Sequence, residues 1–255
     1  MHFATLLVHM LASNFPQNSF TLQQTSPADV VLCFPPSPSA LVTCHANQNR
    51  MLIKIARQEA IDRYPSLPLR LYKANEDEEV FNYPEIYANH VLTIPSKSYK
   101  GHVKLLGTQL VFLANQLGFD TFIFLGDEDI AWLQRLNTYD TFKEALQYLV
   151  DNKISRRFNG ALQVDQTEIP TFIRHLAWLV RTNGILPYVH FIDPGQNIIG
   201  NICQYGNLHI STNNKIADSN FVSAIGKSEF KYLTEGNCYN KFSKNGAIKD
   251  RVATV

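Results

Sequence analysis

The sequence predicts an α+β fold in which an antiparallel sheet is flanked by helices. Near the C-terminus three strand-like segments follow one another across tight turns, and several segments upstream show helical periodicity. The chain has 255 residues, 45% of them hydrophobic, which is enough for one sizeable core. No Gly/Ser-rich or Pro-rich linker interrupts its middle, so we expect a single domain over residues 1–255.

The N-terminal half mixes short strands with one helix. Strands are predicted at residues 28–34, 40–44, 67–72 and 89–95. A helix is predicted from Met51 to Ile61, because apolar residues recur there at helical spacing until Pro65. An acidic turn is expected at residues 75–79.

The middle of the chain predicts three helices and one strong strand. The helices cover residues 103–117, 139–151 and 169–182, and the strand covers residues 121–125. Gly118 is a helix stop, since glycine adopts the left-handed conformation that ends many helices.

The C-terminal third predicts an antiparallel hairpin and a third strand. Residues 187–192 form the first strand, and Asp193-Pro194-Gly195-Gln196 has the proline and glycine of a tight turn. Residues 197–203 return, and residues 207–212 follow.

Composition restricts the function and the compartment. With 23 Lys and Arg against 22 Asp and Glu, the net charge is +1, so a nucleic-acid site has to be a local patch. The apolar residues 1–12 lack the positive region of a signal peptide, because the first Lys or Arg is Arg50. No run reaches 18 apolar residues, and we expect a soluble, cytoplasmic protein without a membrane partner.

The cysteines predict neither a disulfide scaffold nor a zinc site. There are four, and no C-x-x-C pair occurs. We expect reduced core residues at Cys33, Cys44, Cys203 and Cys238.

A Mg²⁺-dependent endonuclease is one hypothesis. Asp127 and Asp129 follow a strong strand, and Asp151-Asn152-Lys153 supplies an acid-x-Lys element. In such a site that element lies on a strand, whereas residues 146–150 indicate the end of a helix. The alternative interpretation of Asp127–Asp129 is an acidic loop without a metal.

His190 and Asp193 are the main candidates for chemistry. A spacing of three places two side chains on opposite faces of a strand, so they converge only if the chain bends at Asp193. Alternatively, Asp193 caps its own turn and His190 is a core histidine with a hydrogen-bond partner.

The segment Tyr188-Val189-His190-Phe191-Ile192-Asp193, together with Glu78 and Tyr83, resembles the active-site pattern of the PabI-type restriction DNA glycosylases. This resemblance covers the chain from about residue 28 onward. It implies a metal-independent enzyme that excises adenine from the palindrome GTAC in double-stranded DNA. It also implies a homodimer whose antiparallel sheet is strongly curved, like a half-pipe, and no cofactor.

The resemblance assigns roles to individual side chains. Asp193 stabilises the oxocarbenium-like sugar and orients the attacking water, and His190 assists by hydrogen bonding or proton transfer, with a pKa expected near neutrality. Tyr83 belongs to this catalytic group and offers a ring on which a flipped adenine stacks. Glu78 either accepts from the adenine amino group or holds an arginine.

Basic residues are the candidates for DNA contacts. The resemblance calls for an arginine, for which Arg50, Arg57 and Arg70 are alternatives, and for a lysine near the active site, for which Lys153 is a candidate. Between Glu85 and Asp120 the only charged residues are the three lysines Lys97, Lys100 and Lys104, which suit a phosphate-binding loop. Two further basic groups are Arg156–Arg157 and the cluster Lys241, Lys244, Lys249 and Arg251. A third hypothesis, a non-enzymatic binding or immunity protein, makes these clusters incidental.

Overall fold

The computed structural model describes residues 52–73, 78–133, 139–182, 189–233, 238–243 and 247–248, all within the unit Gln48–Val255. The helices are α1 (Arg57–Arg63), α2 (Tyr99–Leu117), α3 (Asp140–Asp151), α4 (Ile169–Thr182) and α5 (Lys215–Gly226). The strands are β1 (Leu52–Ile55), β2 (Leu69–Lys73), β3 (Glu78–Asn82), β4 (Ala88–Thr93), β5 (Thr121–Leu125), β6 (Ala161–Asp165), β7 (His190–Ile192), β8 (Ile198–Ile202), β9 (Leu208–Thr212) and β10 (Lys231–Tyr232).

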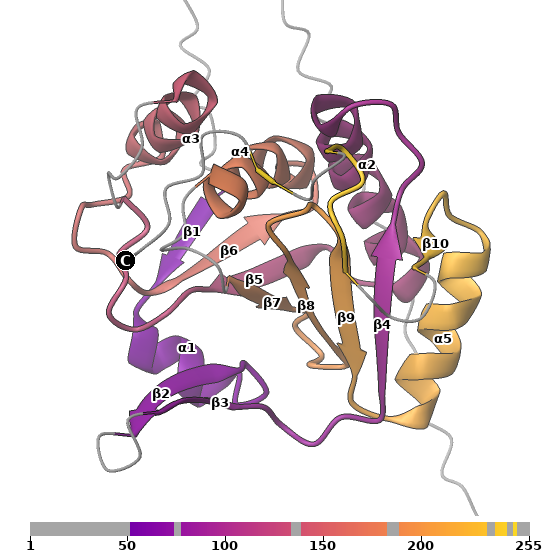
Figure 1. The fold of residues 1–255 in the computed structure, drawn as a ribbon. Coiled ribbons are helices and arrows are strands. Elements are labelled where there is room, and N and C mark those ends of the chain that lie inside the picture. Colours follow the sequence, from indigo (N-terminus) through magenta and orange to yellow (C-terminus); the bar gives the residue numbers. More distant parts are fainter. Residues whose placement is uncertain are drawn as a thin grey trace, which may run out of the picture. The chain divides into compact units, whose positions relative to one another are not determined.

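The predicted α+β class is confirmed. One open sheet of eight strands has the order β1-β6-β5-β7-β8-β9-β4-β10, every pair in it is antiparallel, and β2 and β3 form a separate hairpin. Figure 1 shows the strand direction turning from β6 and β5 to the upright β9 and β4, which gives the sheet its curvature. In this strand order β7 lies in the interior of the sheet, between β5 and β8.

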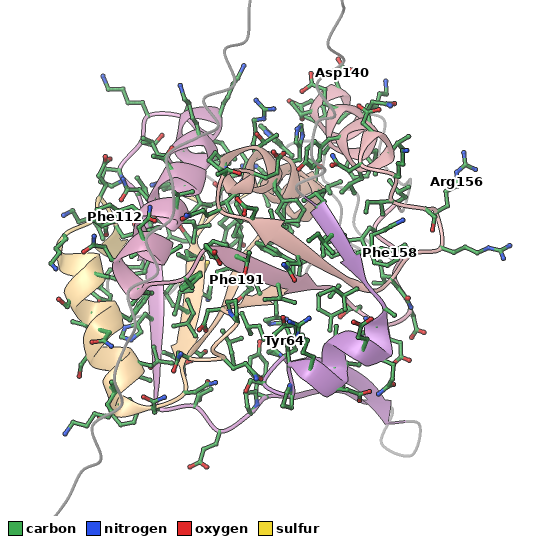
Figure 2. The ribbon with its side chains drawn as sticks, turned by 180° about the vertical axis from the view of Figure 1, so that it is seen from behind. Tyr64, Phe112, Asp140, Arg156, Phe158 and Phe191 are labelled. Atoms are coloured by element: carbon green, nitrogen blue, oxygen red, sulfur yellow. The ribbon has the colours of Figure 1, made fainter. Side chains whose placement is uncertain are left out.

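The two faces of the sheet are covered differently. Helices α2, α3, α4 and α5 supply residues to the larger core, which includes Phe191 of β7, whereas α1 covers a smaller core on the other face with Tyr64 and Leu67. Figure 2 shows Phe191 between the strands and the helices, and Tyr64 beside α1. Because side chains alternate along a strand, His190 and Ile192 share the face of the smaller core.

Gly200 on β8 permits close packing in the larger core. A Cβ atom there would lie 2.2 Å from Cζ of Phe191 and 2.6 Å from Cδ1 of Ile210. The glycine thus leaves the room that the Phe191 ring occupies across the β7–β8 pair.

Several elements match their predictions, and others correct them. Residues 121–125 and 169–182 have the predicted bounds, and Gly118 ends α2 in the left-handed conformation with φ 79°. The helix expected from Met51 is wrong in its first half, because residues 52–55 pair with β6 as strand β1. α2 begins at Tyr99 rather than 103, since Ser98 caps it by accepting from the Gly101 amide.

Four further elements were not predicted: β3, β6, α5 and β10. β3 includes Glu78 and Glu79, which were expected in a turn. The strands predicted at residues 28–34 and 40–44 lie outside the described residues. In the part of the chain that is described, no helix is both long enough and apolar enough to cross a bilayer.

Candidate active site

Tyr83 and His190 form a close pair although 107 residues separate them in the chain. The Tyr83 hydroxyl lies 2.5 Å from Nε2 of His190, and the two rings meet edge to face with centroids 5.5 Å apart. His190 is 3% exposed, whereas Tyr83 is 46% exposed. The hydroxyl is therefore anchored on a buried imidazole while much of the aromatic ring remains accessible.

Burial fixes the protonation state of His190. Desolvation lowers its pKa from 6.5 to about 4, so the imidazole is neutral at neutral pH. The expectation of a pKa near neutrality is therefore wrong for the folded protein. A neutral imidazole has one nitrogen that accepts and one that donates, so it either accepts the Tyr83 proton or donates to the phenol oxygen.

Asp193 is held within its own hairpin. Oδ1 accepts from the backbone amides of Asn197 at 2.7 Å and Ile198 at 2.8 Å, and Oδ2 accepts from Nδ2 of Asn197 at 3.3 Å. The Gln196 amide also donates to the Asp193 carbonyl, which closes the predicted turn. Asp193 thus caps its own turn. The expected contact with His190 is not among the hydrogen bonds of its carboxylate, whereas His190 contacts Tyr83.

Asp193 also borders a cavity of about 110 Å³ between the β7–β8 hairpin, the end of α2 and α5. Phe119, Ile198 and Ile216 are among its apolar lining residues, and Asn220 adds a polar side chain. Oδ2, with a single long hydrogen bond, has more capacity for a further donor than Oδ1.

A polar row crosses the sheet from His190, and sequence reasoning missed it. His190 pairs with Asn201 of β8, and Asn201 pairs with His209 of β9. Residues paired in this way lie side by side on one face. Short-range spacing holds no sign of the row, which only the strand register reveals.

Arg70 and Glu78 lie in the hairpin that precedes Tyr83. Arg70 pairs with Phe81, and Glu78 pairs with Lys73, so both belong to the β2–β3 unit. Their side chains lie outside the described part of the structure, and their proposed substrate contacts stay predictions.

The three lysines of the predicted phosphate-binding loop are exposed at the start of α2. Lys97 precedes the helix, Lys100 lies in its first turn and Lys104 in its second. Arg156 and Arg157 are exposed as well, and Figure 2 shows Arg156 at the periphery, pointing away from the protein.

Two basic candidates have partners in the structure that differ from the expected DNA contacts. Lys241 donates to Oγ1 of Thr93 at 2.9 Å and to the Ile94 carbonyl, so its ammonium group holds a loop. Arg57 donates to the carbonyls of Gly126 and Asn159. Arg50, Lys244, Lys249 and Arg251 lie outside the described residues.

Lys153 is not brought beside His190. Its carbonyl accepts from Nζ of Lys54 on the edge strand β1, which is three positions from β7 in the sheet. At a strand spacing of about 4.8 Å, β1 itself is roughly 14 Å from β7, the strand of His190.

The carboxylates of the endonuclease hypothesis do not gather into a metal site. Within the described residues the only group of three or more candidate ligands is Cys203, His209 and Cys238. Burial lowers the pKa of Arg57, while the nearby acidic residues Glu128, Asp127 and Asp129 oppose this shift, so the loop faces a guanidinium. Asp151 ends α3, as the helical interpretation predicted.

Comparison with known proteins adds no relative. The chain matches no protein-family model, no curated protein and no solved structure. The assignment of function therefore depends on the residues and their geometry.

Proposed function

We propose that this protein is a cytoplasmic restriction DNA glycosylase that excises adenine from GTAC in double-stranded DNA, as a homodimer and without a metal in the reaction. The observation that carries the proposal is the 2.5 Å contact between Tyr83 and His190. The resemblance grouped these two residues, and the fold joins them across 107 positions. An antiparallel sheet that is open and curved agrees with the same resemblance.

Tyr83 is suited to receive the extruded base. An enzyme that breaks a base–sugar bond has to move the base out of the duplex, and a stacked base gains about 1–3 kcal/mol on an aromatic ring. Tyr83 is 46% exposed as a residue, and the contact to His190 fixes the orientation of its ring. The neutral His190 serves in this scheme as a hydrogen-bonding partner of the phenol rather than as a cation.

Asp193 is the group that would supply the negative charge of the reaction. It borders a cavity on the α2–α5 side of the sheet, whereas His190 faces the α1 side, so in this proposal the nucleotide reaches the carboxylate at the β7–β8 turn, where the chain bends. Loss of adenine builds positive charge on the sugar, which a nearby carboxylate stabilises, and the same carboxylate orients the attacking water. Oδ2 is the oxygen with capacity to bind that water, since Oδ1 accepts two backbone amides. Glycine at position 195 keeps space beside Oδ2, because a Cβ there would lie 3.0 Å from it.

The exposed lysines at the start of α2 are proposed to contact phosphates. Lys97 precedes α2, Lys100 and Lys104 lie in its first two turns, and the sequence has no acidic residue between Glu85 and Asp120. If each neutralises one phosphate, replacing one by Gln makes the slope of log K against log salt less negative by about 0.9.

The proposal is tested with a GTAC duplex and a control duplex in which these four bases are permuted. Each is incubated with the protein in Mg²⁺-free buffer containing EDTA, and free adenine and alkali-labile breaks are measured. We expect both products from the GTAC duplex alone. His190→Gln and Tyr83→Ala are expected to abolish excision, and Tyr87→Phe, at another exposed tyrosine, is the matched control.

Three outcomes would overturn the proposal. Direct strand breaks that require added Mg²⁺ would favour the endonuclease hypothesis. Equal adenine release from both duplexes would show that excision is not specific for GTAC, which a restriction enzyme requires. Absence of any product, with EDTA and with added Mg²⁺ alike, would leave the binding or immunity protein as the better hypothesis.

A further inference from the structure

Three potential metal ligands meet where the β8–β9 hairpin contacts the segment after β10. Cys203 directly follows β8, His209 lies on β9, and Cys238 begins the described segment 238–243. The two Sγ atoms are 3.1 Å apart, and one ligand atom from each of the three residues lies within 4.8 Å of the other two. Ligand atoms around tetrahedral zinc are about 3.6–3.8 Å apart, so the three side chains need shifts of about 1 Å or less.

The local backbone explains why the two hairpin residues share this position. The Cys203 amide donates to the Asn207 carbonyl at 3.0 Å, and the turn between them contains Gly206 at φ 83°. Because side chains alternate along the paired strands, Cys203 and His209 lie on the same side of the hairpin. This is the face that carries the polar row from His190.

Asn207 fixes the third ligand. Its side-chain amide donates to Sγ of Cys238 at 3.2 Å and to the Tyr239 carbonyl at 3.2 Å, and it is only 1% exposed. An N–H group that donates to a cysteine sulfur is a common outer partner of metal-bound thiolates, where it orients the ligand.

His209 argues against a simple disulfide. Its Nε2 atom is buried and has no partner at full hydrogen-bond geometry among the described residues, and the imidazole lies against the Cys238 thiol, as a ligand of the same ion would. A metal bond would satisfy this buried nitrogen fully, whereas a Cys203–Cys238 disulfide would leave it without a strong partner. The Sγ separation of 3.1 Å is also well above the disulfide bond length of about 2.05 Å.

We propose that Cys203, His209 and Cys238 bind one Zn²⁺ ion, which fastens the C-terminal segment 238–243 to the β8–β9 hairpin. Two thiolates and one imidazole form a ligand set that suits zinc. The described residues supply three ligands, and we assign the fourth position to a water molecule.

The zinc site is separate from the candidate active site. His209 is two strands from His190 in the polar row, which corresponds to about 10 Å. The ion therefore has a structural role in this proposal, which stands or falls independently of adenine excision.

The first test measures metal in the untagged full chain purified under reducing conditions without chelators. We expect about one zinc per chain by mass spectrometry of the metal content. Cys203→Ser, His209→Gln and Cys238→Ser are each expected to lose it. The double variant Cys33→Ser, Cys44→Ser is the matched control, because it removes the other two cysteines and should retain the zinc.

The second test loads the metal-free reduced protein with Co²⁺. We expect thiolate-to-cobalt charge-transfer absorption and the intense visible bands of tetrahedral cobalt, both removed by added Zn²⁺. Zinc should raise the melting temperature of the wild type and leave that of Cys238→Ser unchanged.

Each of four results would refute the zinc site. The first is the absence of the cobalt absorption bands in reduced protein, and the second is a Cys203–Cys238 disulfide that persists under reducing conditions. The third is zinc retained by the Cys238→Ser variant, and the fourth is zinc lost from the Cys33→Ser, Cys44→Ser control.

Discussion

Replacement of Tyr83 by phenylalanine isolates the contact on which the proposed function depends. The substitution keeps the exposed ring and removes only the hydroxyl group, which lies 2.5 Å from Nε2 of His190. His190 is 3% exposed, so water has little access to the nitrogen that is left behind. A buried group that loses its partner costs about 1–3 kcal/mol, and we expect the free energy of unfolding to fall by about 1–2 kcal/mol.

The same variant separates the two proposed roles of Tyr83. Because the ring remains, affinity for GTAC duplex is expected to stay within a few-fold of the wild type, whereas the excision rate falls. Tyr83→Ala removes the ring as well, and loss of about 1–3 kcal/mol of stacking should weaken binding by about 5- to 150-fold.

Urea unfolding, a DNA-binding titration and single-turnover adenine release measure these effects. Tyr87→Phe is the control, because Tyr87 is 54% exposed and also precedes β4. The reasoning is refuted if Tyr83→Phe equals the wild type in stability and if the NMR chemical shifts of the His190 imidazole nitrogens are the same in both proteins.

Three further predictions concern stability. The pKa of His190 is about 4 in the folded protein and 6.5 when unfolded, so the unfolded chain takes up the proton first as the pH falls. Protonation of this residue should therefore lower the free energy of unfolding by up to about 1.4 kcal/mol per pH unit between pH 6.5 and 4. Urea unfolding at several pH values should show a shallower decline for His190→Gln than for the wild type. Asp193→Asn places an amide donor against the donors of Asn197 or Ile198, so it should cost about 1–2 kcal/mol of stability and abolish excision. Asn197→Ala keeps the carboxylate and should retain excision. Equal activity of Asp193→Asn and the wild type would show that Asp193 only caps its turn. Gly200→Ala forces a Cβ against Phe191 and should lower stability by about 1–3 kcal/mol in the same assay, and an unchanged midpoint would contradict the packing across β7 and β8.

The parts of the fold that were predicted are those whose local signal agrees with their tertiary setting. β5 is a continuous apolar strand with buried neighbours, and α4 has a long apolar face, so pattern alone gives their bounds. The helix prediction for residues 52–55 failed for a physical reason. Leu52 and Ile55 fit a helical face as well as a strand end, and pairing with β6 decides between them.

The candidate site was predictable only in part. The resemblance grouped Tyr83 with His190, but the shift of the His190 pKa depends on burial, which spacing does not show. Cys203, His209 and Cys238 were missed because their spacing matches no compact zinc motif. They meet through the register of β8 with β9 and through the hydrogen bonds of Asn207.

The position of His190 favours a functional over a structural role. An apolar residue would fit an interior strand whose same-face neighbours, Leu125 and Ile192, are buried and apolar, and it would avoid the desolvation that lowers the histidine pKa. One partner of His190 is the hydroxyl of Tyr83, a residue that is 46% exposed, so the polar contact extends from the core to an accessible aromatic surface. A buried polar residue that orients an exposed ring breaks the local packing rule where a binding site would require it.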